Sequence, residues 1–310
     1  MIKKNLFRIL ILLALLIVFA VFVEKKQRLA EQEIPQKPLT EQISEKPVVF
    51  KPVTILPKVI MPGDPIMITS HATSTVTKIT YDGKLLPLAS FDSFTRAFVP
   101  VDFNEKNFKH EVKVYLSDGS IITEPVVITQ REKIERPLGI PEKLGGNTPA
   151  AEKALVDNLT KENVILAAIK TDQKQLWPKG FGVPLNSIFV TDDYGYDRKT
   201  VGSTIVHKGT DFRAQEGTEV KSINDGVVKI AREFTVYGNT IVVDHGQGIQ
   251  SFYMHLSRID VKDGDLVRAG QILGLSGKTG YAEAAHLHLS IKIKGISIDP
   301  MTFLRFFTVI

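Results

Sequence analysis

Three short segments in the C-terminal part of this 310-residue chain carry histidine and aspartate at spacings that suit metal chemistry. The first, "HKGTDF", places His207 and Asp211 four residues apart, and Gly209 between them favours a turn over a helix. An imidazole and a carboxylate on one tight bend can converge on a single cation. This pair alone is weak evidence, because histidine and aspartate often occur at this spacing by chance.

The second segment, "HLHLSIKI", alternates polar and apolar residues as a half-buried strand does. We expect His286, His288 and Ser290 on one face, with the intervening leucines and isoleucine on the other. Side chains two apart on a strand lie about 7 Å from each other, close enough for one imidazole to hold a metal while the other contacts its bound water. The polar outer face of an edge strand would give the same pattern.

The third segment, "SFYMHLS", also alternates and predicts a strand. Period-two geometry puts Tyr253 and His255 on one face, and Phe252, Met254 and Leu256 on the other. A single histidine in such a strand is usually structural.

Together the three segments supply the residues of a hydrolytic zinc site. Such a site needs three nitrogen or oxygen ligands and an open position for water. His207, Asp211 and one histidine of the 286/288 pair provide that number. Histidine also suits the transfer of protons between water and a leaving amine, and His255 and the other member of the pair are available for it.

The elements that position these residues are predicted to be mainly β-strands. Residues 174–310 consist of apolar runs punctuated by glycine, such as "NTIVVDHG" and "QILGLSG", which indicates a compact antiparallel β domain. Residues 131–173 form a predicted helical linker. Its helix has Thr148 as N-cap and Pro149 in the first turn, followed at helical spacing by Leu155, Leu159, Leu166 and Ile169.

Residues 48–130 are predicted to form a β-sandwich-like module of about seven short strands. Asp82-Gly83 and Asp118-Gly119 each lie between apolar flanks and are strong hairpin signals. His71 and His110 are isolated here and are interpreted as surface or packing residues.

The N-terminus has the charge and hydropathy order of an export signal. Basic residues precede an unbroken apolar run from Ile9 to Val23, with no small-residue cleavage site after it. We therefore expect an uncleaved signal anchor, a transmembrane helix over residues 1–24, followed by a flexible tether over residues 25–47. The chain would then be anchored to the cytoplasmic membrane, with its catalytic domain exported to the periplasm or outer face.

Composition excludes several kinds of chemistry. The chain has no cysteine, which removes thiol catalysis, Cys-ligated zinc and disulfides. Its net charge of +5 comes from 39 basic residues dispersed along the chain. Without a basic block or an interleaved aromatic stripe, nucleic-acid binding is not expected.

With these residues in view, the C-terminal part resembles the lysostaphin/LytM-type zinc metallopeptidases, peptidase family M23. The resemblance runs from about Phe181 to Phe303 and rests on "HKGTD", "YGNTIVVDHGQGIQSFYMHL" and "HLH" followed by "SI", with "GDLVRAGQILGLSGKTG" between them. It implies that His207, Asp211 and His288 are the Zn²⁺ ligands. It further implies that His255 and His286 are the catalytic histidines that position or deprotonate the water and stabilise the oxyanion. His245, which lies within the matching stretch, is interpreted as structural.

The resemblance implies an endopeptidase that cuts peptide cross-links of bacterial peptidoglycan, with the β-module as a spacer, a cover or a docking site for an envelope protein partner. The alternative is a non-catalytic relative that binds and activates a wall amidase or scaffolds an envelope complex. Two segments depart from the family pattern, "YAEAA" before the His-x-His and "YGYDRK" before the first motif. Both bear on specificity more than on the zinc site.

Overall fold

The computed structural model describes residues 51–310 except 92, 179, 201, 309 and 310. Lys51–Ile310 form one compact unit. Its N-terminal strands are β1 (Val53–Leu56), β2 (Pro65–Ser70), β3 (Val76–Tyr81), β4 (Lys84–Leu85), β5 (Ala89–Phe91), β6 (Phe94–Pro100), β7 (Lys109–Leu116) and β8 (Ile121–Val127). The linking elements are β9 (Glu135–Pro137), the 3-10 helix η1 (Glu142–Leu144) and α2 (Pro149–Ala167).

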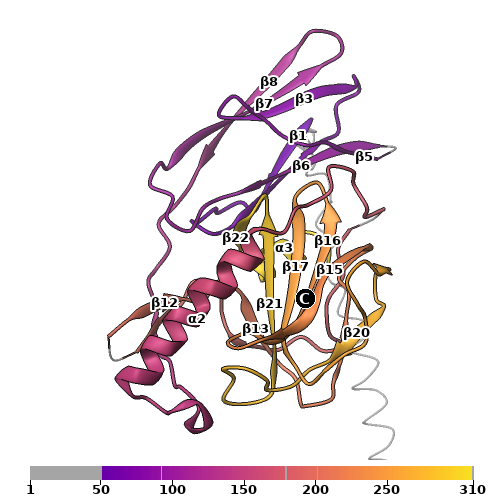
Figure 1. Cartoon of the computed structure of the whole chain (residues 1–310). Helices are drawn as coiled ribbons and strands as arrows, with labels where there is room; N and C mark the ends of the chain where they lie inside the picture. The colour runs from indigo at the N-terminus through magenta and orange to yellow at the C-terminus, as the bar shows by residue number, and fades with distance from the viewer. Residues whose placement is uncertain (1–50, 92, 179, 201, 309–310) are drawn as a thin grey trace, which may run out of the picture. The chain divides into compact units, whose positions relative to one another are not determined.

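The remaining elements belong to the C-terminal region and are coloured from red to yellow in Figure 1. They are β10 (Val190–Asp192), β11 (Asp197–Lys199), β12 (Thr204–Val206), β13 (Thr210–Arg213), β14 (Glu219–Lys221), β15 (Gly226–Phe234), β16 (Gly238–Gly246), β17 (Ile249–Leu256), β18 (Arg258–Ile259), β19 (Leu266–Val267), β20 (Ile272–Leu275), β21 (His286–Ile293), β22 (Ile296–Ile298) and α3 (Pro300–Arg305).

The first eight strands form two four-stranded sheets, in the orders β1-β2-β6-β5 and β4-β3-β7-β8. Alternate side chains of both sheets, including Ile68, Ile79 and Val112, share one buried core. Both Asp-Gly pairs lie in turns between paired strands, as the sequence predicted. In the tighter turn, β3 and β4 are joined through Asp82 and Gly83 alone, and both residues have positive φ.

The C-terminal region is built on an eight-stranded sheet whose central strands β13, β21, β17, β16 and β15 run side by side (Figure 1). One face of this sheet carries the larger apolar core, which includes Tyr253, Leu287 and Leu289. The other face carries a smaller core around Phe252 and Met254. The candidate ligands share this second face, so the large core on the first face holds their strands in register.

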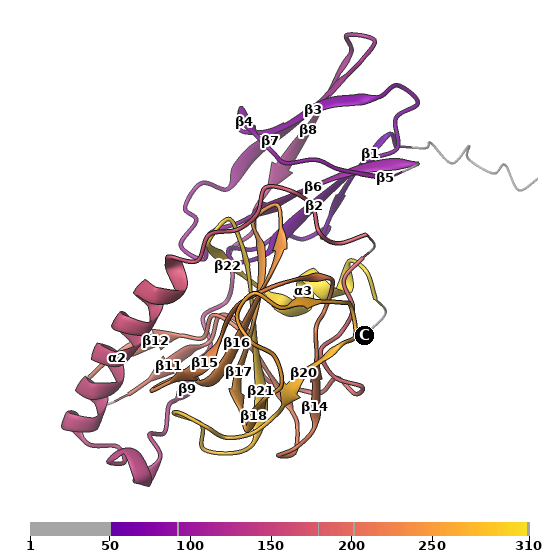
Figure 2. The same cartoon turned by 45° about the vertical axis from the view of Figure 1, so that its right-hand side comes forward.

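Helix α2 packs on the second face of the sheet. Thr148 accepts a hydrogen bond from the Ala151 amide and so caps the helix, as the sequence predicted. Leu166 belongs to the core around Phe252 and Met254, and Leu155 packs in a separate small cluster. Figure 2 shows the short strands β9, β11 and β12 beside α2. Strand β9 pairs in parallel with β11, which brings the linker against the segment preceding the first motif.

The N-terminal sheets also contact the C-terminal region directly. The side chains of β2 alternate, so that Ile66 and Ile68 enter the N-terminal core while Met67 joins the larger C-terminal one. Phe98 packs against Trp177 with ring centroids 5.9 Å apart. The strand β2 is therefore buried on both faces, which is why all six of its residues are buried.

The predicted fold class needs one correction. Among the residues that the structure describes, no helix is both long and apolar enough to cross a membrane. The predicted transmembrane helix at 1–24 and the tether at 25–47 lie outside the described residues. The fold class that the structure supports is a mainly β protein with a C-terminal β domain. For the same reason, the predicted anchorage in the cytoplasmic membrane with an exported catalytic domain is not supported.

Candidate metal site

Strand pairing brings together residues that are distant in the sequence. Asp211 in β13 is the direct antiparallel partner of His288 in β21. His207 lies in the three-residue connection between β12 and β13, which bends at Gly209. A Cβ at Gly209 would overlap the His288 imidazole and the Leu289 carbonyl oxygen. The turn can therefore approach β21 this closely because residue 209 has no side chain.

The three predicted ligands form one buried cluster. Their ligand atoms all lie within 4.8 Å of one another. His288 Nδ1 lies 2.7 Å from Asp211 Oδ1 and 3.1 Å from His207 Nε2, and His207 Nε2 lies 3.2 Å from the same carboxylate oxygen. The structure thus brings His207, Asp211 and His288 together as the sequence interpretation required.

Hydrogen bonds on the far sides of both imidazoles fix their orientation. His207 Nδ1 donates to the Asp193 carbonyl oxygen at 2.8 Å. Ser290 Oγ gives its single proton to the Lys208 carbonyl, so it accepts from His288 Nε2 at 2.9 Å. When both imidazoles are neutral, the nitrogens that remain, His207 Nε2 and His288 Nδ1, each present a lone pair to the cluster.

Three acceptors, two imidazole nitrogens and a carboxylate oxygen, therefore face one another with no donor between them. Such an arrangement is repulsive unless a cation lies among them. Two histidines and one aspartate are the ligands of a zinc site with room for a further ligand. The donor set fits Zn²⁺.

The electrostatics of the cluster favour the protonation states that a metal requires. Burial alone would raise the pKa of Asp211, but the facing His207 and His288 hold it well below the usual range. Burial lowers the pKa of His288 to about 4, against the opposing effect of Asp211. At neutral pH the carboxylate is ionised and the His288 imidazole is neutral.

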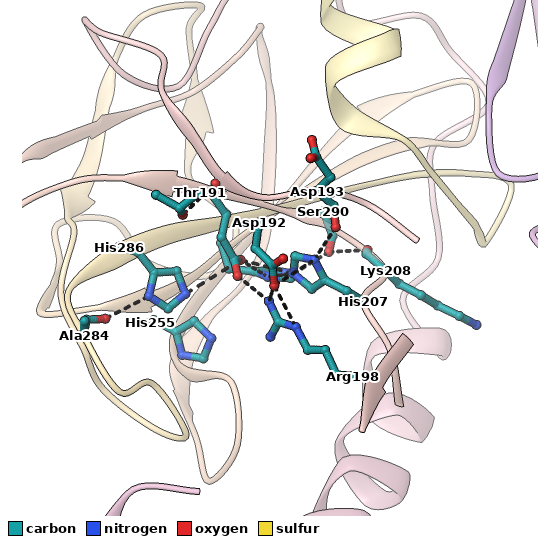
Figure 3. A network of polar contacts seen from close by, with 12 residues as sticks. Thr191, Asp192, Asp193, Arg198, His207, Lys208, His255, Ala284, His286 and Ser290 are labelled. Carbon is teal, nitrogen blue, oxygen red and sulfur yellow. Dashed lines mark hydrogen bonds and ion pairs between the residues drawn. The ribbon is translucent and has the colours of Figure 1, made fainter. Parts of the chain in front are cut away.

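Arg198 is a contact that the sequence analysis missed. Its Nη2 donates to Asp192 and to Asp211 Oδ2, the carboxylate oxygen that does not face the histidines (Figure 3). Asp192 is itself the strand partner of Asp211 through the pairing of β10 with β13. Arg198 belongs to "YGYDRK", which stood out in the sequence only as a departure from the family pattern. The contact depends on long-range strand pairing, so local spacing carries no signal for it.

The two predicted catalytic histidines lie beside the cluster (Figure 3). His286 Nε2 is 3.7 Å from Asp211 Oδ1, and its Nδ1 donates to the Ala284 carbonyl oxygen at 2.9 Å. His255 Nδ1 donates to the Thr279 carbonyl oxygen, also at 2.9 Å. The ring centroids of His255 and His286 are 4.9 Å apart. In the neutral form of each histidine, Nε2 is therefore the nitrogen without a proton.

The predicted face of His255 is wrong. Tyr253 and Leu256 enter the larger core, whereas His255 lines a cavity on the other side of the sheet together with Phe252 and Met254. The register with β16 shifts between Ile241↔Tyr253 and Asn239↔Leu256, and His255 has a φ of 61°. This β-bulge adds one residue and reverses the alternation, which places the imidazole next to the candidate ligands.

The cavity has a volume of about 610 Å³ and lies between α2 and the ligand-bearing face of the sheet. His207, His255 and His288 line it, together with Leu155 and Leu159 of α2. Tyr281, from the unusual "YAEAA" loop, lines it as well.

The other histidines lie apart from this site. His245 is fully buried, its two ring nitrogens contact the Asp225 carbonyl and Ser251, and burial lowers its pKa to about 4. That is the structural role predicted for it. His110 contacts the Asp82 carboxylate and stacks on Tyr81, and the ring of His71 packs against Phe94.

Comparison with known proteins finds similarity over the segment that carries this site. Residues 205–300 match the model of peptidase family M23. ShyA of Vibrio cholerae, named a peptidoglycan DD-endopeptidase, is 42% identical over 95 residues, which cover 31% of this chain and 22% of that protein. ALE-1 of Staphylococcus capitis, named a glycyl-glycine endopeptidase, is 42% identical over 120 residues, 36% of this chain and 33% of that protein. The chain thus spans a third or less of the length of these two relatives.

A solved structure shares more of the fold. A Pseudomonas aeruginosa protein assigned to peptidase M23 aligns with 79% of this chain and 94% of its own length, with a TM-score of 0.51 and 24% identity. At that identity the likeness shows the fold alone.

Proposed function

We propose that this chain, whose residues 205–300 match the model of peptidase family M23, is a zinc-dependent endopeptidase that hydrolyses peptide cross-links of bacterial peptidoglycan. The observation that carries the proposal is the cluster of three acceptors, His207 Nε2, Asp211 Oδ1 and His288 Nδ1, that face one another without a donor. Two further imidazoles with free Nε2 atoms lie next to it.

His207, Asp211 and His288 would hold the zinc ion. Bound there, zinc would lower the pKa of a water molecule toward 7 and polarise the carbonyl of the scissile peptide bond. Arg198 would keep the Asp211 carboxylate turned so that Oδ1 faces the histidines, since it binds the other oxygen.

His286 and His255 would move the protons. Burial, then repulsion from His286 and His288, lowers the pKa of His255 to about 3, so this imidazole is neutral at neutral pH. In each histidine Nδ1 donates to a backbone carbonyl, which leaves Nε2 as the atom that can take a proton from the attacking water. The imidazolium so formed would stabilise the oxyanion and deliver the proton to the departing amine.

The substrate class rests on the relatives. One is named for a DD-endopeptidase activity on peptidoglycan and the other for cleavage between glycines. Both names describe endopeptidases, but they point to different bonds. We therefore propose the reaction class without one bond, which mass analysis of the fragments released from defined cross-linked muropeptides would identify.

The test is His288→Ala in the full-length chain. The wild-type chain is expected to bind about one zinc ion and to release muropeptides from purified peptidoglycan. The variant loses one of three ligands and is expected to lose bound zinc and at least about a thousandfold in product release. Zinc is measured by elemental analysis and products by mass spectrometry.

The matched control is His110→Gln, a histidine in the N-terminal sheets away from the cluster, which should keep both properties. Unchanged product release by His288→Ala would sink the catalytic proposal. A wild-type chain that binds zinc and peptidoglycan, releases nothing and stimulates a wall amidase would favour the non-catalytic alternative instead.

A further inference from the structure

Lys292 is a partly buried lysine on the same strand face as the candidate site. It follows His288 and Ser290 in β21 at period two, so its side chain leaves the sheet on the ligand side. Its Nζ lies 4.7 Å from the centroid of the Phe252 ring, and Phe252 is the strand partner of Ser290. The side chain therefore leans back along the strand toward the site.

The Lys292 ammonium group has no acidic partner among the residues that the structure describes. No carboxylate of the described residues lies within ion-pair distance of Lys292 Nζ, and within the same residues this also holds for Lys208. Burial, and then the positive charge of Lys208, lower the pKa of Lys292. The Lys208 side chain points away from the ligand cluster (Figure 3). Two cations thus lie close together without a counter-ion, which is unfavourable for a partly buried group.

Both lysines line the same cavity as the candidate ligands. Its lining includes three basic side chains, Arg198, Lys208 and Lys292, and one carboxylate, Asp102. Arg198 is paired with Asp192 and Asp211, so the two lysines are the basic groups without an acidic partner among the described residues. Asp102 accepts a hydrogen bond from the Asn104 amide. Phe252 and Met254 provide an apolar floor between Lys292 and the site. A cationic end and an apolar floor suit an extended peptide that carries a carboxylate.

We propose that Lys292 binds a free carboxylate of the peptide substrate close to the scissile bond, assisted by the charge of Lys208. This inference rests on the proposed function, and it specifies the substrate class of that site. Strand geometry places the Cα atoms of His288 and Lys292 about 13 Å apart, and the lysine leans back across part of that distance. An extended peptide advances about 3.3 Å per residue, so a carboxylate at this distance from the site belongs to a residue one to three positions from the bond that is cut.

The test compares pairs of cross-linked peptides that differ at one group. In each pair the carboxylate one, two or three residues from the scissile bond is either free or converted to a primary amide. For the zinc-loaded full-length chain we expect kcat/KM to favour the free carboxylate at one position by tenfold or more, on the order of one hydrogen bond to a charged group. In Lys292→Met the ratio of kcat/KM for the free carboxylate to kcat/KM for the amide should fall to near one. Lys292→Arg should restore most of the wild-type ratio.

Lys294→Met is the matched control, because Lys294 is an exposed lysine near the end of the same strand and does not line the cavity. It should keep the wild-type ratio. The inference is overturned if the wild-type chain shows no carboxylate preference in any pair. It is also overturned if Lys292→Met lowers kcat/KM equally on both members, which is what a purely structural lysine stacked on Phe252 would give.

Binding separates this inference from the proposed function. Fluorescence anisotropy of the same labelled peptides with the zinc-free full-length chain measures Kd without turnover. If no peptide is cleaved but the free carboxylate still binds tighter in a Lys292-dependent way, the proposed function fails and the carboxylate site stands. If peptides are cleaved but neither Kd nor kcat/KM depends on the carboxylate, the proposed function stands and the carboxylate site fails.

Discussion

At the scale of single residues, the geometry of the candidate ligands is set by groups that do not face the cluster. The Asp193 carbonyl and Ser290 hold the far nitrogens of the two histidines, and Arg198 holds the far oxygen of Asp211. Gly209 adds a steric condition, because its missing side chain leaves the space that the His288 ring occupies. These contacts hold the ligands in the orientation that a metal ion requires, which lowers the cost of binding one.

Gly209→Ala tests this steric condition. The new methyl group would collide with the His288 imidazole and the Leu289 carbonyl oxygen, so the ring must turn away from Asp211. We expect zinc affinity to fall by roughly ten- to a hundredfold, as when groups supporting a metal ligand are lost. Competition with a chromogenic chelator measures the affinity. Gly182→Ala is the control, because its Cβ would have an ordinary contact at 3.6 Å; equal affinities in the two variants would contradict this account.

At the scale of elements, α2 is fixed to the C-terminal sheet by polar contacts as well as by leucines. The buried Glu162 carboxylate accepts hydrogen bonds from the backbone amides of Val236 and Tyr237 at the β15–β16 turn. Asn163, next to it, accepts from the Tyr237 hydroxyl. Because the helix lines the cavity, these contacts determine the width of the space beside the candidate ligands.

Glu162→Ala removes the acceptor for two backbone amides and leaves them buried without a partner. We expect the free energy of unfolding to fall by about 1–3 kcal/mol. Amide hydrogen exchange in α2 should rise by at least as much as exchange elsewhere, because the helix loses its anchor first. Lys161→Ala changes the exposed neighbouring side chain and should stay within about 0.5 kcal/mol. Equal stability of the two variants would show that the leucines alone hold the helix.

At the scale of the whole described unit, a buried ionic cluster joins the N-terminal sheets to the C-terminal region. Arg131 donates to Asp64 before β2 and lies 3.8 Å from Asp299, the residue that caps α3. Burial raises the pKa of Asp64 to about 6 and also raises that of Asp299, although Arg131 opposes both shifts. The junction between the two regions is therefore sensitive to acidity in a range where surface carboxylates are already ionised.

Asp64→Asn tests this junction. Folded Asp64 keeps its proton up to about pH 6, whereas the unfolded chain loses it near its ordinary pKa of 3.8. The folded state therefore binds more protons between these values, and its stability falls as pH rises from about 4 to 6. Relative to Asp64→Asn, the wild-type chain should lose up to about 3 kcal/mol over this window. Urea unfolding at several pH values measures the difference.

The control for this pH dependence is Asp118→Asn. Hydrogen bonds from Ser120 and Ser74 lower the pKa of Asp118 to about 2, so the folded and unfolded chains differ in proton binding at this residue mainly below pH 4. Its stability difference from the wild-type chain should stay flat between pH 4 and 6. A parallel loss in both comparisons would assign the effect to the net charge of the molecule instead of Asp64.

The sequence predicted those parts of the site that follow regular local geometry. Residues 286 to 291 alternate without interruption, so the face of His286 and His288 could be predicted, and Gly209 marked the turn beside His207. The face of His255 could not be predicted, because the bulge that reverses it arises from pairing with β16. The contacts of Arg198 and Lys292 likewise depend on which distant residues the sheet brings near. The family resemblance, and not the alternation, is what predicts that His255 lies at the site.

His255 has a left-handed backbone conformation at the β-bulge in β17. The position of its imidazole therefore depends on the number of residues in this strand. In an uninterrupted pleat, position 255 would point with Tyr253 into the larger core, where an imidazole would meet no proton-transfer partner. Substitutions along the strand cannot change this orientation, because the backbone determines which face of the sheet each position points to. The geometry of the candidate site therefore depends on chain length: removing one residue here would shift the alternation of the strand and turn His255 into the core, with every other candidate site residue still present.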